Sequence, residues 1–223
     1  MEKNWKFAIG AVVLSSLAIT ACAPLVVAAV AAGTAVVVTD RRTTGTQLDD
    51  QTIQLRVANE LSTALKDKPV HINVNSFDRK VLLTGEVPDE ATKAKAGEIA
   101  TASQNVRAVV NELVIAPPST FSERAEDTGL GTKVRAAFIN TREIAFNSIG
   151  IVTERQVVYL LGLVSQKEGD IAALVASKVS GVKQVVKVFD YATQDQVDKR
   201  RAAEAAAPPA TAPAGTVTPG TQK

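Results

Sequence analysis

Residues 80–87, KVLLTGEV, decide the fold, because residues 157–164, VVYLLGLV, repeat their pattern 77 positions later. Both segments are rich in Val and Leu, and both keep a glycine at the same place, Gly85 in the first and Gly162 in the second. A short segment rich in aliphatic and β-branched residues favours a buried strand. A glycine inside such a strand is typical of a bulge or of a close approach by another element. The chain therefore holds two copies of one structural module.

The similarity between the two copies extends well beyond these strands. Residues 52–99 match residues 129–176 at the same spacing, and one deletion restores the match further along the chain. Self-similarity over this length indicates a duplicated domain. We therefore expect homologous domains at 51–116 and 127–192. The polar segment between them, PPSTFSERAED, is expected to be a linker.

Each module is expected to follow the order αββαβ. In the first module, Ile53, Val57 and Leu61 recur at helical spacing, after Asp49 and Asp50 as candidate N-terminal caps. Helices with one apolar face cover one side of a sheet, so the pattern predicts an α+β fold with two helices on one face of a three-stranded mixed sheet. The expected helices are 53–65, 90–102, 130–141 and 166–179, and the expected strands are 70–75, 80–87, 107–115, 147–153, 156–163 and 183–190.

The N-terminal segment resembles a bacterial lipoprotein signal. Lys3 and Lys6 precede an uncharged apolar run, which ends in Ile19-Thr20-Ala21 before Cys22, the only cysteine in the chain. We expect a signal peptide over 1–21 and a lipid on Cys22. The alternative is an uncleaved N-terminal helix with an incidental cysteine. Residues 22–50 are then an Ala/Val-rich leader, and the Ala/Pro/Thr-rich tail, 193–223, is expected to be disordered.

The composition argues against several classes of function. A single cysteine excludes an intrachain disulfide, and His71 is the only histidine, so the sequence predicts no metal site, no cofactor and no catalytic residue. His71 is interpreted as an incidental surface or strand-edge residue. The formal net charge of +2 is too small for a nucleic-acid partner. An enzyme is not expected.

The module resembles the BON domain. Both copies carry V-x-L-x-G-x-V, at 81–87 and 158–164, and the segment Ser180-Gly181-Val182 is also similar to that family. Two such domains that follow a lipoprotein signal resemble the dual-BON-domain outer-membrane lipoproteins, the YraP/DolP-like family. The resemblance implies a protein on the inner leaflet of the outer membrane, facing the periplasm. It also implies that the second domain binds anionic phospholipid and that the protein supports envelope integrity and cell division.

The two copies differ on one face of the duplicated strand. Leu82, Thr84 and Glu86 in the first copy become Tyr159, Leu161 and Leu163 in the second. An apolar face of this size is normally covered. Its candidate covers are the first domain, a membrane or a partner protein.

A second difference lies in and after the first helix of the second copy. Apolar residues there replace polar residues of the first copy, and basic residues flank them. The resulting candidate membrane-binding residues are Lys133, Arg135, Ile139, Arg142, Ile144 and Phe146. Anionic membrane surfaces attract such mixtures of apolar and basic groups, although the same charges also serve to solvate a helix. The family carries a large aromatic residue just before this helix, where this chain has Gly129. The alternative function is a protein adaptor that regulates cell-wall hydrolases or outer-membrane assembly through the BON domains and depends on Leu161, Leu163 or the first domain.

Overall fold

The computed structural model describes residues 42, 44–193, 195–196 and 199. The expected signal peptide, Cys22, most of the leader and most of the C-terminal tail lie outside the described residues. The described residues belong to one compact unit, which contains both expected domains. Among the described helices, none is both long enough and apolar enough to cross a membrane.

The first domain confirms the expected order of elements. Its strand β2 pairs antiparallel with β1 and parallel with both β3 and β4. The last strand, expected to be continuous, is interrupted because the side chain of Asn111 folds back and accepts a hydrogen bond from the Leu113 amide at 3.3 Å. The elements are α2 (Thr44–Ala64), β1 (His71–Phe77), β2 (Lys80–Val87), α3 (Glu90–Ala102), β3 (Ala108–Asn111) and β4 (Val114–Ile115).

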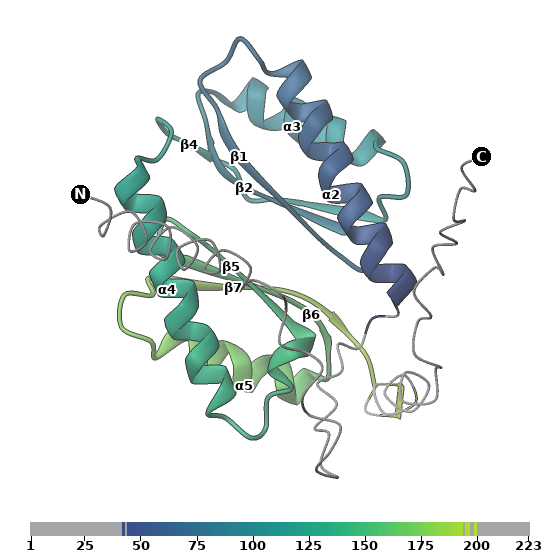
Figure 1. Cartoon of the computed structure of the whole chain (residues 1–223), viewed down its shortest axis with the longest axis vertical. Helices are drawn as coiled ribbons and strands as arrows, with labels where there is room; N and C mark the ends of the chain where they lie inside the picture. The colour runs from purple at the N-terminus through teal and green to yellow at the C-terminus, as the bar shows by residue number, and fades with distance from the viewer. Residues whose placement is uncertain (1–41, 43, 194, 197–198, 200–223) are drawn as a thin grey trace, which may run out of the picture. The chain divides into compact units, whose positions relative to one another are not determined.

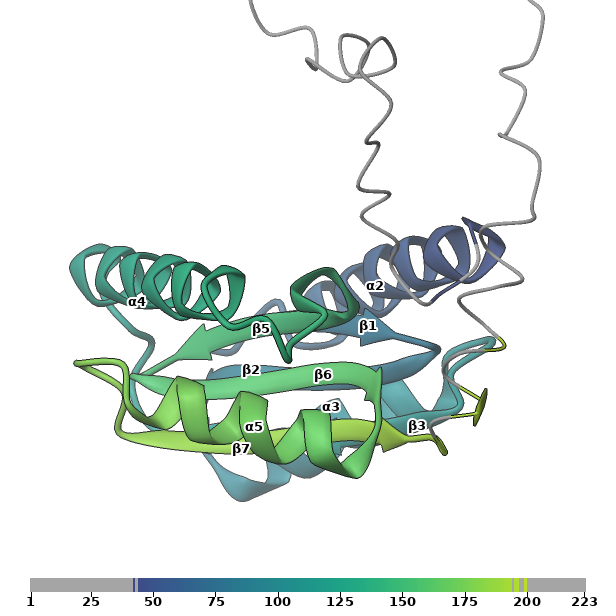
Figure 2. The same ribbon diagram turned by 90° about the horizontal axis from the view of Figure 1, so that it is seen from below.

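The second domain repeats this order, and its strand β6 lies between β5 and β7 (Figure 2). Its first helix begins nine residues before the expected start, within the expected linker. Thr120 and Glu123 form a capping box, in which each side chain accepts a hydrogen bond from the backbone amide of the other. The elements are α4 (Phe121–Ile139), the short 3₁₀ helix η2 (Phe146–Ser148), β5 (Ile149–Glu154), β6 (Val157–Val164), α5 (Gln166–Ser177) and β7 (Gln184–Tyr191).

Each domain has its own hydrophobic core between its helices and its sheet. Figure 1 shows α2 and α3 on one face of the first sheet, and α4 and α5 on one face of the second. Ile53, Val57 and Leu61 fill the first core as their helical spacing predicts. Val134 and Phe138 hold the equivalent place in the second core. The α+β fold expected from the repeat is therefore confirmed.

The two sheets pack against each other through the faces that their helices leave free. Phe77 and Leu82 of the first domain form one buried cluster with Tyr159, Leu161 and Leu163 of the second. Of the three candidate covers for the apolar face of β6, the structure shows the first domain. Leu161 and Leu163 are buried there, so neither is accessible to a partner protein in this conformation.

Gly85 and Gly162 lie where the backbone at the start of the preceding strand comes very close, at His71 of β1 and at Ser148 just before β5. A Cβ atom on Gly85 would lie 2.1 Å from the carbonyl oxygen of His71, and one on Gly162 would lie 2.6 Å from that of Ser148. Gly85 also has φ of +114°, a conformation that side-chain-bearing residues rarely adopt. Each glycine therefore permits its central strand to pair with the strand before it.

A buried aspartate ties the first helix of each domain to its β-hairpin turn. Asp50 lies inside α2, rather than capping its N-terminus as expected, and accepts hydrogen bonds from the amides of Asp78 and Arg79. Asp127 in α4 accepts the equivalent bonds from the amides of Arg155 and Gln156, both at 2.8 Å. These turns contain residues with positive φ, so the carboxylates hold an otherwise unfavourable backbone in place.

Replacing Asp127 with Asn is expected to destabilise the second domain. The amide side chain keeps one acceptor oxygen, so one of the two turn amides loses its partner, which costs about 1–3 kcal/mol. Urea unfolding followed by circular dichroism measures the loss. The matched control is Asp170→Asn, which breaks an exposed ion pair with Lys187 and should change stability little, because solvent screens such pairs. Equal effects of the two substitutions would contradict a structural role for Asp127.

Candidate functional site

Four of the six candidate membrane-binding residues are exposed on α4 or in the turn after it. Lys133 and Arg135 point outward from α4, Ile139 is its exposed last residue, and Arg142 follows in the turn. None of the three cations forms an ion pair within the described residues. Cations that are not engaged internally remain available to an external anion.

The other two candidates lie elsewhere. Ile144 is only 5% exposed and belongs to the second core, and Phe146 is half-buried against the same core. The comparison with the first copy predicts that both lie on the surface, because the first copy is polar in this region, with Asp67 and Pro69 as their counterparts. After α4, however, the chain turns back over its own sheet and buries Ile144. Ile144 therefore does not contribute to the exposed surface.

Sequence reasoning missed an aromatic residue on the same helix. Phe121, the first residue of α4, is 81% exposed. It precedes Ile139 by 18 residues, which is five complete helical turns, so both lie on one side of α4 about 27 Å apart. The Thr120–Glu123 capping box was the signal that could have revealed this longer helix. An aromatic residue is thus present at the N-terminus of α4, although Gly129 occupies the position at which the family resemblance implies one.

The residues between Phe121 and Ile139 on this side of α4 are small. A methyl group added at Gly129 would meet no atom within 4 Å, so this side of the helix is open. We call the exposed apolar and small residues, together with the three cations, the α4 surface: Phe121, Ala125, Thr128, Gly129, Thr132, Ala136 and Ile139, with Lys133, Arg135 and Arg142.

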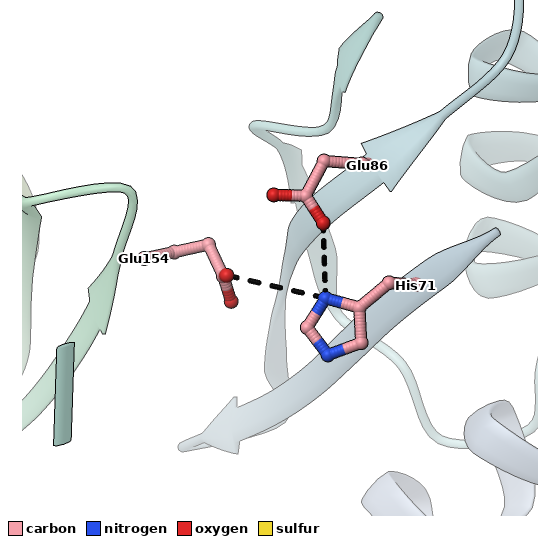
Figure 3. Close-up of side chains that lie close together, drawn as sticks. All are labelled: His71, Glu86 and Glu154. Atoms are coloured by element: carbon pink, nitrogen blue, oxygen red, sulfur yellow. Dashed lines mark hydrogen bonds and ion pairs between the residues drawn. The ribbon is translucent and has the colours of Figure 1, made fainter. Parts of the chain in front are cut away.

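A polar cluster lies behind this surface, between the two sheets. Figure 3 shows His71, Glu86 and Glu154 converging, with the Nδ1 atom of His71 facing both carboxylates. Nδ1 lies 3.0 Å from Oε2 of Glu86 and 4.0 Å from Oε1 of Glu154. His71 does lie on an edge strand, as expected, but it is not incidental, because it contacts Glu86. The sequence did not reveal the cluster because Glu154 belongs to the other domain.

Burial dominates the electrostatics of the interface. Desolvation, reinforced by the neighbouring Glu86, raises the pKa of Glu154, although a 2.6 Å hydrogen bond from Asn73 and the proximity of His71 oppose the shift. Desolvation also raises the pKa of Tyr159 to about 12, so its hydroxyl stays neutral. Two buried carboxylates therefore face one imidazole: Glu86 from the same domain as His71, and Glu154 from the other domain.

Charged residues at the other end of the interface also join the domains. Lys80 and Arg107 of the first domain contact Asp190 of the second, at 2.7 Å and 2.6 Å respectively. Together with the apolar cluster, these contacts close the sheet faces and leave the helices outermost. The α4 surface is therefore the candidate site for external contact.

The chain resembles known proteins along most of its length. Residues 49–117 and 126–193 each match the BON domain. The chain is 38% identical to the outer membrane lipoprotein DolP of Haemophilus influenzae, over 74% of this chain and 88% of that protein. It is 32% identical to the 21 kDa hemolysin of Actinobacillus pleuropneumoniae, over 68% of this chain and 79% of that protein.

A more distant relative is the osmotically-inducible protein Y of Escherichia coli, 28% identical over 63% of this chain and 72% of that protein. Both BON matches coincide with the two αββαβ units of the structure. By its duplicated fold and by its similarity to DolP, the chain belongs to the BON-domain family, among the outer-membrane lipoproteins that carry two such domains.

Proposed function

We propose that this protein is held on the periplasmic side of the outer membrane by lipid on Cys22 and that its α4 surface binds anionic phospholipid. In this way it supports envelope integrity and cell division. BON-domain lipoproteins of this kind are not an enzyme family. The proposal accordingly rests on a binding surface and not on a catalytic centre.

The observation that carries the proposal is the composition of the α4 surface. Phe121 and Ile139 supply apolar groups at its two ends, and Lys133, Arg135 and Arg142 surround its C-terminal half without internal ion pairs. A basic residue near an anionic bilayer contributes about 1 kcal/mol, and a large apolar side chain that enters it contributes about 1.5–3 kcal/mol.

The first domain lacks this arrangement at the matching positions. Lys133 corresponds to Arg56, whose guanidinium donates a hydrogen bond to the carbonyl oxygen of Gln104 at 2.9 Å. Arg135 corresponds to Ala58, and Ile139 to Ser62. This difference between the domains supports the proposal that the second domain, rather than the first, contacts lipid. A lipid anchor would also raise the effective concentration of the domain at the bilayer, so weak affinity suffices.

The proposal is tested with residues 39–223 and lipid vesicles. We expect binding to vesicles that contain phosphatidylglycerol, with an affinity that falls as salt is added, and little binding to phosphatidylcholine alone. Vesicle co-sedimentation measures both. Equal binding to the two vesicle types would contradict the proposal.

Replacing Phe121 with Ala is expected to weaken vesicle binding about ten-fold, because the lost apolar contact contributes about 1.5 kcal/mol. Phe121 is exposed, so the substitution should leave the unfolding midpoint almost unchanged. The matched control is Leu174→Ala, which removes an exposed apolar side chain from α5. If both variants bind as the original chain does, Phe121 does not enter the bilayer.

The second candidate function is a protein adaptor. It is favoured by Leu48 and Leu55, two exposed leucines seven residues apart on α2, which lie on one side of that helix. Substituting both with Ser separates the two functions. An adaptor that uses α2 loses its crosslinked partner in the envelope, whereas binding to phosphatidylglycerol vesicles is unchanged.

A further inference from the structure

The polar cluster between the domains brings three metal-ligating side chains together. One ligand atom each of His71, Glu86 and Glu154 lies within 4.8 Å of the others. Glu86 has no exposed surface and Glu154 is 5% exposed, whereas His71 is half-buried. The first two ligands come from β1 and β2 of one domain and the third from β5 of the other (Figure 3).

The charges in this cluster are incompletely balanced by protein groups. Glu86 accepts hydrogen bonds from the Ser119 amide at 3.1 Å and from Arg155 at 3.4 Å, but the Arg155 side chain is 45% exposed. Glu154 receives a neutral donor, the side-chain amide of Asn73. Two carboxylates this close repel each other when both are ionised. A bound cation removes this repulsion and favours the ionised form of both.

A buried hydroxyl beside the cluster also lacks a partner. Thr84 lies two residues before Glu86 on β2, so both extend from the same face of the strand. Its Oγ1 is buried and accepts or donates no hydrogen bond in the described part of the chain. Across the strands Thr84 pairs with Asn73, which contacts Glu154. A buried polar atom without a partner indicates that a water or ion completes the site.

A cavity next to the cluster provides access and room for water. Its volume is about 250 Å³, which exceeds the space that a single water needs. Ser119, Glu154 and Arg155 line it, so it borders one of the three ligand residues and two hydrogen-bond partners of Glu86. An ion at the cluster would therefore keep a coordination position open towards the cavity.

We infer that His71, Glu86 and Glu154 form a site for a divalent transition metal, with Zn²⁺ as the ion that best fits the donor set. An imidazole nitrogen with two carboxylates suits Zn²⁺, whereas Mg²⁺ and Ca²⁺ prefer oxygen ligands alone. Ligand atoms of tetrahedral Zn²⁺ lie about 3.4 Å apart, so Glu154 moves towards His71 when the ion binds. Because the ligands come from both domains, the bound metal crosslinks the two BON domains.

The test uses the full chain in detergent, stripped of metal with EDTA and then titrated with ZnCl₂. The chain is produced without a polyhistidine tag and with the substitution Cys22→Ser. His71 is then the only imidazole, and no thiol competes for Zn²⁺. We expect saturable binding of one Zn²⁺ per chain. The ring resonances of His71 in the NMR spectrum should change in step with saturation, and the melting temperature should rise. This readout needs no variant of the cluster.

Two substitutions locate the site. Glu154→Gln keeps the shape of the side chain and an acceptor for Asn73, and it is expected to weaken Zn²⁺ binding at least ten-fold and to abolish the thermal shift. Glu112→Gln removes a different carboxylate from the lining of the same cavity and should leave binding unchanged. Absence of saturable binding overturns the inference, as does binding that survives Glu154→Gln or falls equally with Glu112→Gln.

Discussion

The substitution Gly85→Ala is expected to unfold the first domain or to destabilise it by more than about 4 kcal/mol. The added methyl group would lie 2.1 Å from the carbonyl oxygen of His71, which is fixed by the pairing of β1 with β2. A backbone atom in a strand cannot move aside as a flexible side chain does. The φ of +114° adds a conformational cost of about 1–3 kcal/mol for any residue other than glycine.

The equivalent substitution in the second domain should cost less. Gly162→Ala brings the methyl group to 2.6 Å from the carbonyl oxygen of Ser148, and a positive φ adds no further cost there. The matched control is Gly129→Ala, where the methyl group meets open space in a helix and should stabilise the protein by up to about 1 kcal/mol.

Urea unfolding followed by circular dichroism measures the stability of all three variants. The expected order of stability is Gly129→Ala, then Gly162→Ala, then Gly85→Ala. A Gly85→Ala protein that unfolds at the same urea concentration as the original chain would show that β1 and β2 do not pair in the described register.

Reversing three charges on the α4 surface is expected to reduce affinity for phosphatidylglycerol vesicles more than 100-fold. Lys133, Arg135 and Arg142 are exposed and form no ion pair within the described residues, so their substitution by Glu breaks no ion pair there. Loss of three favourable terms of about 1 kcal/mol each accounts for about 100-fold, and repulsion of the new carboxylates by the bilayer adds to it.

The control for this variant must change the net charge by the same amount. Lys66, Lys167 and Lys178 are exposed and lie outside α4, so their joint substitution by Glu serves this purpose. We expect this control to lose only the small contribution of long-range attraction, which disappears at physiological salt. If both triple variants lose equal affinity, net charge and not the α4 surface determines binding.

The repeat carried most of the information about the fold. The shared pattern of Ile53, Val57 and Leu61 placed the first helix, and the duplicated V-x-L-x-G-x-V segment placed the central strand of each sheet. These elements were predictable because their periodicity reflects burial against their own domain. The interruption between β3 and β4 was not, because it depends on one side-chain hydrogen bond from Asn111.

The candidate site was only partly predictable. The cations of α4 stood out against the first copy, but Phe121 was hidden in a polar segment that was interpreted as a linker. Ile144 was misplaced because the first copy has a polar residue there, which says nothing about how the chain turns after α4. The role of His71 depends on Glu154, more than eighty residues away, and no local pattern reveals such a pairing.

The packing of the two sheets has a consequence for dissecting the protein by truncation. Either module produced without the other would expose its half of the cluster formed by Phe77, Leu82, Tyr159, Leu161 and Leu163 to water. Exposed apolar strips of this kind promote self-association. An isolated second domain would then bind vesicles, detergents and itself through a surface that the intact molecule never presents, and its apparent lipid affinity would be misleadingly high.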